Sequence, residues 1–337
     1  MHGRIERLRL AGRCLEGNPL GDPHERDVYV YVPPTSDSAR LPVILLLPGY
    51  GSNHLSILSY SPWAKNTVER FDEQVVSGQS PPAILALPDC MTRWGGSQFI
   101  DSAGLGRYQS YLVEDVLPAI DAHFPTIPSA EGRAVAGRSS GGFGALRLAM
   151  DRPGVVSAVA SHAADLAFEV SMRPMFTSAA IGLEQAGGLA AFAERLPNGG
   201  PRSAVEFDAA FVLAASAAYS PDRGAPFPHV ALPFHMESAA IRTDVFAQWT
   251  AHDPLTRAHT VMGGQALAAL SLLFVDAGNR DEHGLHFGAR ALAARCRELG
   301  AQLRFEEFDG GHRGTSHRYE LSLPLLAEVL TTQRRGH

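Results

Sequence analysis

The residues best suited to chemistry form a short run between two glycines, Gly137-Arg138-Ser139-Ser140-Gly141. A Gly-x-Ser-x-Gly pattern that joins a strand to a helix predicts a sharp turn with its central serine exposed. The flanking glycines fit such a turn because it leaves no room for side chains. Ser139 is therefore our candidate nucleophile, which would attack a carbonyl carbon. The alternative is a glycine-rich strand-to-helix turn that carries an idle serine.

A serine nucleophile needs a histidine to remove its proton and an acid to orient that histidine. After a turn of this type the expected chain order is serine, acid, histidine. Among the 14 histidines, His312 follows the last predicted strand, in a loop from which it could reach Ser139. Its rivals are His317, His283 and His286, and the alternative role for His312 is that of a solvated loop histidine.

Two aspartates follow the apolar run 271–275 and are candidates for the acid. Asp276 lies at the tip of that predicted strand, whereas Asp281 lies farther into the loop, where it could reach His312. We prefer Asp281 and keep Asp276 as the second choice. Either could instead shape the loop as an Asx turn.

A tetrahedral oxyanion would need two preorganised N–H donors. The backbone of Ser140, the residue after the nucleophile, is the first candidate. The second should come from the loop that follows the apolar run 43–47, where we choose Tyr50, with Gly51 next. The glycines of this loop could also serve only to form the turn.

The elements that must position these residues follow from hydrophobic periodicity. Residues 26–32 alternate and end at a Pro-Pro pair, which predicts a half-exposed antiparallel strand near a sheet edge. Continuous apolar runs predict strands buried on both faces, as in a parallel sheet. Such runs lie at 43–47 and 83–87. Further strands are expected at 133–137, 155–160, 271–275 and 303–308, and helices at 58–76, 108–124, 143–150, 285–299 and 319–331. This alternation predicts an α/β fold with a mostly parallel, doubly wound sheet flanked by helices.

Residues 165–264 break this rhythm. We expect a single domain over residues 1–337 that contains a mostly helical, cap-like insertion at 165–264, although ordinary crossover helices with long loops remain the alternative. Apolar side chains of the insertion could line an acyl site or form the insertion's own core. Our substrate-binding candidates are Gly51, Trp94, Met172, Phe176 and Trp249. The wider apolar set also includes Met175, Phe211, Phe234, Met236 and Phe246.

Composition excludes several classes of protein. The chain of 337 residues has a net charge of -6 and no basic run of the kind that binds nucleic acid. We expect no membrane span, because no segment reaches the roughly 20 apolar residues required. Its three cysteines form no Cys-x-x-Cys pair, and the pair His283 and His286 lacks further ligands, so we assign no metal and no cofactor. The absence of a secretory leader pattern favours a cytoplasmic protein.

Several motifs taken together are more specific than any one of them. They are Asn18-Pro-Leu-Gly-Asp22, Leu47-Pro-Gly-Tyr-Gly51, Gly95-Gly-Ser-Gln-Phe-Ile-Asp-Ser102, Tyr111-Leu-Val-Glu-Asp-Val-Leu-Pro118, the serine turn, Gly278-x-x-Asp281-Glu282 and Gly311-His312. In this order they resemble the putative esterase family of α/β-hydrolases, which includes S-formylglutathione hydrolases, feruloyl and acetylxylan esterases, enterochelin esterases and mycolyltransferases. The similarity covers roughly residues 15–160 and 268–330.

The resemblance implies an α/β-hydrolase fold with Ser139, Asp281 and His312 as a catalytic triad. It also implies a serine carboxylesterase acting on a small-molecule ester, with homo-oligomerisation left open. An acyltransferase or thioesterase with the same acyl-enzyme is the alternative, and a non-catalytic binding protein on a hydrolase scaffold is a more distant one. Two departures stand out. The chain has Pro48-Gly49 where members of the family usually have His-Gly, and segment 165–264 has no recognised match.

Overall fold

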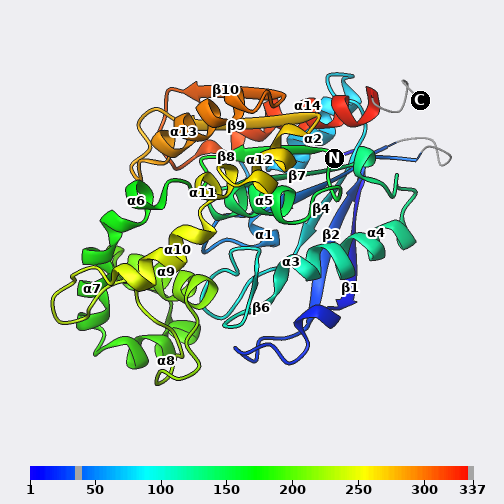
Figure 1. Ribbon diagram of the computed structural model, residues 1–337. Coiled ribbons are helices and arrows are strands. Elements are labelled where there is room, and N and C mark those ends of the chain that lie inside the picture. Colours follow the sequence, from blue (N-terminus) through cyan, green and yellow to red (C-terminus); the bar gives the residue numbers. More distant parts are fainter. Residues whose placement is uncertain (35–39, 333–337) are drawn as a thin grey trace.

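One eight-stranded sheet organises the computed structural model, which describes residues 1–34 and 40–332 (Figure 1). The strand order is β1-β2-β4-β3-β7-β8-β9-β10. Strands β1 and β2 pair antiparallel, as do β2 and β4, and the strands from β4 through β10 pair parallel. The strands are β1 (Arg4–Ala11), β2 (Glu25–Val32), β3 (Val43–Leu47), β4 (Ile84–Pro88), β7 (Arg133–Arg138), β8 (Ala158–His162), β9 (Leu272–Gly278) and β10 (Leu303–Phe308). The expected mostly parallel sheet is confirmed.

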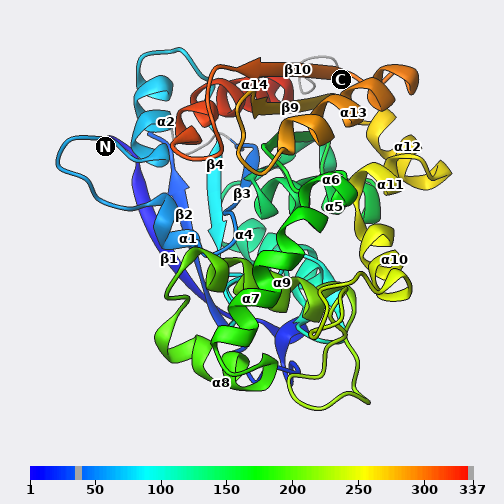
Figure 2. The same cartoon turned by 90° about the vertical axis from the view of Figure 1, so that its left-hand side faces the viewer.

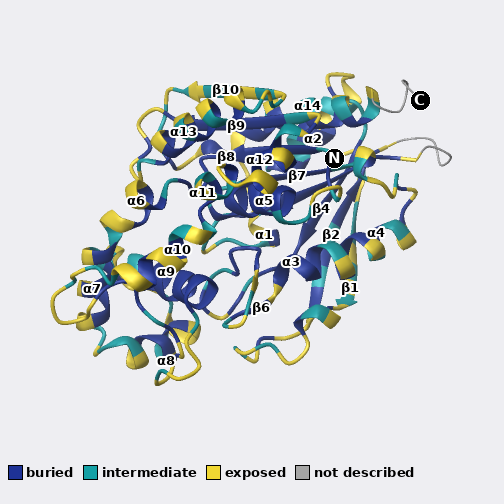
Figure 3. Cartoon of the chain, in the orientation of Figure 1, coloured by how far each residue is buried: buried dark blue, intermediate teal, exposed yellow. Residues whose placement is uncertain are grey.

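The sheet is buried on both faces at its centre, where strands β3 and β4 are apolar at every position. In β3, Val43, Leu45 and Leu47 enter the core on one face, whereas Ile44 and Leu46 enter a second core on the other. This is the pattern expected of a strand covered on both sides. Figure 3 shows these central strands as the darkest part of the molecule.

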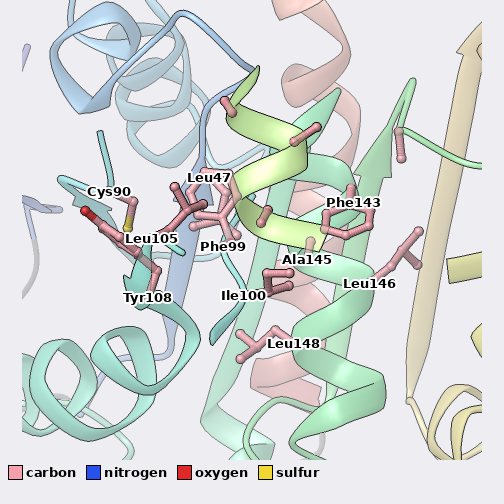
Figure 4. Packing of buried hydrophobic residues seen from close by; sticks show 14 of the residues in the cluster. Leu47, Cys90, Phe99, Ile100, Leu105, Tyr108, Phe143, Ala145, Leu146 and Leu148 are labelled. Atoms are coloured by element: carbon pink, nitrogen blue, oxygen red, sulfur yellow. The ribbon is translucent and has the colours of Figure 1, made fainter. Parts of the chain in front are cut away.

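Helices cover the two faces. On one face lie α2 (Thr67–Val76) and α14 (Tyr319–Thr332), whose side chains join the core of Ile44 and Leu46. On the other face lie α5 (Ser140–Asp151) and a continuous helical stretch made of α3 (Tyr108–Ser110), a π-helical segment (Tyr111–Val116) and α4 (Leu117–His123). Figure 4 shows Phe143, Leu146 and Leu148 of α5 in this core, with Ile100 beside them.

The chain between β8 and β9 is mostly helical, with a longer non-helical stretch at 220–242. It contains α6 (Phe168–Ser171), α7 (Phe176–Gln185), α8 (Leu189–Gly199), α9 (Ala204–Tyr219), α10 (Thr243–His252), α11 (Pro254–Ala258) and α12 (Val261–Ala268). Helices α7, α8 and α9 lie together beyond one end of the sheet in both views (Figures 1 and 2). The segment that breaks the strand and helix alternation in the sequence is thus the one that builds this helical group.

The remaining elements are short, apart from α13 (Leu285–Glu298), which packs on β9. They are α1 (His54–Ile57), the two-stranded pair β5 (Asp101–Ser102) and β6 (Gly106–Arg107), and 3₁₀ turns at Arg13–Leu15, Ala130–Gly132, Arg173–Met175 and Thr315–Arg318. No helix within the described ranges is both long and apolar enough to cross a bilayer.

Two parts of the fold differ from the sequence-based expectation. Strand β1 was not anticipated, and it rather than β2 forms the edge of the sheet. The helix expected at 58–76 begins only at Thr67, where the Asn66 side chain accepts the N–H of Glu69 and the Glu69 carboxylate accepts the N–H of Asn66. This reciprocal capping box sets the start of α2.

Candidate active site

The serine turn lies between β7 and α5, as its sequence pattern predicts. Ser139 has φ 56° and ψ −123°, a strained conformation for a residue with a side chain. The flanking glycines make it attainable, because a Cβ at Gly141 would clash with the Leu47 carbonyl and one at Gly137 would clash with Gly141. The turn is therefore packed so tightly that only glycine fits at positions 137 and 141.

His312 and Asp281 lie in line with Ser139. The Ser139 Oγ is 3.2 Å from His312 Nε2, and His312 Nδ1 is 2.9 Å from an Asp281 carboxylate oxygen, Oδ2. These three residues come from the turn after β7, the loop after β9 and the loop after β10. A histidine held in this way can accept a proton on Nε2 while its Nδ1–H donates to the acid.

The environment of Asp281 favours its charged form. Burial would raise the pKa of this carboxyl, but the hydrogen bond and positive charge of His312 and the backbone N–H groups of His283 and Leu285 lower it below its ordinary value. Asp276, our second choice for the acid, lies elsewhere. It accepts a bond from Arg318 Nε at 2.6 Å and is 2.8 Å from His162 Nδ1.

The loop that carries His312 is anchored on both sides. Glu282 accepts the His312 backbone N–H at 2.8 Å, and this bond lowers the pKa of Glu282. Arg138, the residue before the serine, donates to the Thr315 hydroxyl at 3.2 Å and to the His312 carbonyl at 3.4 Å. These bonds tie the histidine loop directly to the serine turn.

Two backbone N–H groups border Ser139. The N–H of Ser140 is the first of α5, where the helix supplies no acceptor. The second belongs to Tyr50, in the loop after β3, and neither N–H has a hydrogen-bond acceptor among the described residues. Gly49 places this loop close to the serine, since a Cβ there would lie 3.3 Å from the Ser139 Cβ. The N–H of Gly51, by contrast, is taken by the Gly95 carbonyl at 2.9 Å.

A cavity of about 140 Å³ opens at Ser139. One part of its wall is apolar and comes from the helical segment, while the other is polar and surrounds His312. It is lined by Gly49, Tyr50, Arg138, Ser139, Asp165, Ser171, Met172, Met175, Phe207, Asp208, Phe211, His283, Leu285, His312 and Arg313. Met172, expected to touch substrate, therefore lies at the cavity.

The other four expected substrate contacts do not line this cavity. Phe176 and Trp249 are buried in an aromatic cluster with Phe234 and Phe246. The centroid of the Phe176 ring lies 5.4 to 5.7 Å from the ring centroids of the other three residues. Such a cluster is the core of the helical segment. Trp94 lines a separate cavity of about 700 Å³, and its indole N–H donates to the Ala193 carbonyl. Gly51 is likewise absent from the lining of the Ser139 cavity.

The rival histidines take other places. His283 lies edge-on to the His312 ring, with centroids 5.0 Å apart, and burial lowers its pKa. His286 is buried against Phe287, and His317 is exposed beside the Gly314 carbonyl. Within residues 1–34 and 40–332, no group of three or more His, Cys, Asp and Glu side chains is arranged to hold a metal ion.

Two carboxylates at the cavity were not predicted from the sequence. Asp165 follows β8 and accepts a hydrogen bond from the Ser140 hydroxyl at 2.8 Å. Asp208 lies on α9 and accepts one from Ser178. A signal for Asp165 does exist, because ligands of parallel sheets bind beyond the carboxyl ends of strands. Asp208 lies within a helix whose sequence carries no such signal.

Comparison with known proteins places this chain in a family. The family model described as Putative esterase matches residues 22–324. Two curated proteins of Mycobacterium tuberculosis, Esterase MT1326 (strain CDC 1551 / Oshkosh) and Esterase Rv1288 (strain ATCC 25618 / H37Rv), are 35% identical over 82 residues. That match covers 24% of this chain and 18% of each relative, so it spans less than a fifth of the relatives' length.

Solved structures resemble the whole chain. A ferulic acid esterase is 17% identical with a TM-score of 0.61, and the match covers 98% of this chain and 99% of that one. An S-formylglutathione hydrolase from Agrobacterium tumefaciens is 15% identical with a TM-score of 0.59, covering 98% and 96%. FphF, a fluorophosphonate-binding serine hydrolase of Staphylococcus aureus, is 15% identical with a TM-score of 0.58, covering 98% and 99%. At these identities the likeness shows the fold, which is that of the α/β-hydrolases.

Proposed function

The chain belongs to the Putative esterase family, and on that premise we propose that it is a serine carboxylesterase that forms an acyl-enzyme on Ser139. The observation that carries the proposal is the unbroken series of contacts from Ser139 Oγ to His312 Nε2, at 3.2 Å, and from His312 Nδ1 to Asp281, at 2.9 Å. A small-molecule ester is the proposed substrate, and every step uses groups of this chain.

In the acylation step, the Ser139 Oγ attacks the carbonyl carbon of the ester while its proton passes to His312 Nε2. The carbonyl oxygen becomes an oxyanion, and the tetrahedral intermediate collapses as the bond to the leaving oxygen breaks. That oxygen takes the proton from His312 Nε2 and departs as the alcohol. The products of this half-reaction are the alcohol and the acylated serine.

Deacylation repeats the step with water as the nucleophile. His312 Nε2 takes a proton from water, the hydroxide oxygen bonds to the acyl carbon, and the bond to the Ser139 Oγ breaks as that oxygen recovers a proton. Asp281 carries its charge throughout and stabilises the imidazolium that forms in each half-reaction. The lowered pKa of Asp281 supports this role.

The N–H groups of Ser140 and Tyr50 are the proposed oxyanion donors. Both are free of other acceptors within the described chain, and both belong to segments packed against Ser139. The ring of Tyr50 holds its loop in place, because its hydroxyl donates to the Trp94 carbonyl at 2.8 Å and its edge packs on Phe211 of α9. Preorganised donors of this kind commonly contribute about 3 to 4 kcal/mol to catalysis.

The dimensions of the cavity favour a short acyl group. Sites for drug-sized ligands occupy roughly 300 to 1,000 Å³. The cavity at Ser139 holds about 140 Å³, and Met172, Met175 and Phe211 form an apolar part of its lining. We therefore expect acetyl and propanoyl esters to be preferred over octanoyl and longer esters.

The test compares hydrolysis of p-nitrophenyl esters from acetyl to dodecanoyl with covalent labelling by a fluorophosphonate. The wild type should turn over the short esters and carry one label, and Ser139→Ala should lose both. Ser140→Ala is the matched control, because it removes the neighbouring hydroxyl but keeps the backbone N–H, and it should still be labelled. Turnover that persists in folded Ser139→Ala contradicts the proposal. Turnover that requires an added alcohol acceptor would instead assign the acyl-enzyme to a transferase.

A further inference from the structure

Asp165 is a buried carboxylate at the nucleophile that the ester-cleaving steps do not use. Only 5% of its surface is exposed, and it lines the cavity that contains Ser139. One carboxylate oxygen, Oδ2, accepts the Ser140 hydroxyl at 2.8 Å. Among the described residues Ser140 is the one side chain that donates to this carboxylate at ordinary hydrogen-bond distance, and the Ser139 hydroxyl lies near enough to lower its pKa. One acceptor of a buried acid thus remains available at the cavity.

In the part of the chain that the structure describes, no cation pairs with this carboxylate. Some of its surroundings raise its pKa and others lower it. Burial raises the pKa of Asp165 to about 6, although the Ser140 and Ser139 hydroxyls and the charge of His312 oppose that rise. Asp281 repels it from the β9 loop, and Tyr219 of α9 faces it as a neutral phenol whose own pKa is raised by burial. Arg138 lines the same cavity but donates to the histidine loop.

A buried acceptor of this kind discriminates between acyl groups. An alkyl acyl chain that fills the cavity removes water from Asp165 and supplies no hydrogen-bond donor in its place. The desolvation of the carboxylate then costs binding free energy. An acyl group with a hydroxyl or ammonium donor replaces that water with a charge-assisted bond. Because Asp165 accepts the hydroxyl of Ser140, the residue next to Ser139, and lines the same cavity as Ser139, the donor has to lie close to the carbonyl carbon.

We propose that Asp165 forms a subsite for a hydrogen-bond donor on the α-carbon of the acyl group, so that α-hydroxy or α-amino acyl esters are the favoured substrates. The inference rests on the proposed esterase function. Asp165 is thereby a specificity-determining residue, in addition to holding the Ser140 side chain.

The test uses methyl esters of nearly equal size, followed by release of acid in a pH-stat. Methyl propanoate has no polar α-substituent, methyl 2-hydroxypropanoate and alanine methyl ester carry a donor there, and methyl 2-methoxypropanoate carries an oxygen that cannot donate. Methyl 3-hydroxypropanoate moves the donor one carbon away. We expect kcat/KM to be at least about tenfold higher for the two α-donor esters than for the propanoate and methoxy esters, the effect of one hydrogen bond to a charged group.

Variants separate this subsite from a structural role. Asp165→Asn can still accept the Ser140 hydroxyl but has no charge, so the α-donor preference should fall to about threefold or less, mainly through KM. Asp208→Asn is the matched control, because that carboxylate lines the same cavity and already accepts Ser178, and it should keep the wild-type preference. In the wild type the alanine ester should lose its advantage as pH falls through about 6, where Asp165 gains a proton.

Each outcome bears on one claim. Equal turnover of the propanoate, methoxy and α-hydroxy esters by the wild type overturns the subsite even if Asp165→Asn fails to fold, and it leaves the esterase proposal intact. A uniform loss of kcat on all five esters in Asp165→Asn shows a structural role only and also overturns it. A preference for 3-hydroxypropanoate overturns the α-position. Absence of turnover on these esters and on p-nitrophenyl acetate contradicts the esterase function itself.

Discussion

Replacing Asp281 with asparagine tests the function of a single oxygen atom. The Asp281 Oδ1 accepts the backbone N–H of His283 at 2.9 Å and that of Leu285 at 3.4 Å, and its Oδ2 faces His312 Nδ1 at 2.9 Å. The amide oxygen of asparagine has to serve the two backbone donors, so its NH₂ group turns toward His312. Nδ1 must then accept, which moves the ring proton to Nε2, where it faces Ser139 and blocks proton transfer.

The expected effect on catalysis is large and the effect on stability is small. A histidine in the wrong tautomer lowers kcat by about 10⁴, which corresponds to about 5.5 kcal/mol of activation free energy. The folded state keeps both backbone bonds and exchanges one charge-assisted bond for a neutral one, a loss of about 1 to 3 kcal/mol. The assay combines kcat on p-nitrophenyl acetate with urea unfolding.

Asp276→Asn is the matched control, because the sequence offers both aspartates for the same role. The Asp276 side chain is fully buried and pairs with Arg318 and His162, so its neutralisation leaves a buried guanidinium with Glu306 as its remaining carboxylate partner among the described residues. Breaking a buried pair typically costs about 3 to 5 kcal/mol of stability. We expect this variant to be destabilised while the folded fraction keeps kcat within about tenfold of the wild type.

The reasoning is refuted if the two variants exchange these outcomes. A stable Asp276→Asn without activity, together with an Asp281→Asn that keeps more than about a tenth of wild-type kcat, would mean that Asp281 does not orient the base.

Three other predictions concern the serine turn, the aromatic cluster and pH. Gly141→Ala should abolish labelling of Ser139, because the new Cβ clashes with the Leu47 carbonyl; full labelling would show that the turn has room to relax. Phe176→Ala should lower the unfolding free energy by about 3 to 5 kcal/mol yet keep the acyl-chain preference, and a shift of that preference would place Phe176 at the cavity. Burial and the charge of Arg147 lower the pKa of His252 to about 4 from its ordinary 6.5. Between pH 6.5 and 4 the unfolded chain therefore carries a proton on this histidine that the folded chain lacks. The free energy of unfolding falls as the pH drops through this range, by at most about 3 kcal/mol. His252→Gln should flatten the fall seen in urea unfolding between pH 6.5 and 4, and an unchanged slope would rule out this histidine as its source.

The sheet and the serine turn could be predicted because their signals are local. Apolar runs mark β3 and β4 almost residue by residue, and the glycines around Ser139 follow from the sterics of the turn itself. Strand β1 was missed although its apolar residues alternate with arginines and a glutamate, the pattern of an edge strand with one solvent-facing side. The helix expected from residue 58 begins at Thr67, where the capping box lies.

The choice between Asp276 and Asp281 lay beyond the local sequence. Asp276 lies within β9 and Asp281 in the loop after it, and each lies beside a histidine in the folded chain, Asp276 with His162 of β8 and Asp281 with His312 after β10. The partners come from segments more than thirty and more than a hundred residues away in the chain. Only the order of strands in the sheet decides which aspartate meets which histidine.

The packing of distant segments also decides which apolar residues of the helical segment line the cavity and which form its core. Met175 lines the cavity, whereas the next residue, Phe176, turns into the aromatic cluster with Trp249. Both are apolar residues at adjacent positions, so composition and periodicity treat them alike. The sequence by itself determined the sheet, the serine turn and the histidine that faces it, because these depend on backbone sterics and hydrophobic period. The tertiary structure alone decided the acid's partner, the wall of the cavity and the position of Asp165, because these depend on how distant segments pack against one another.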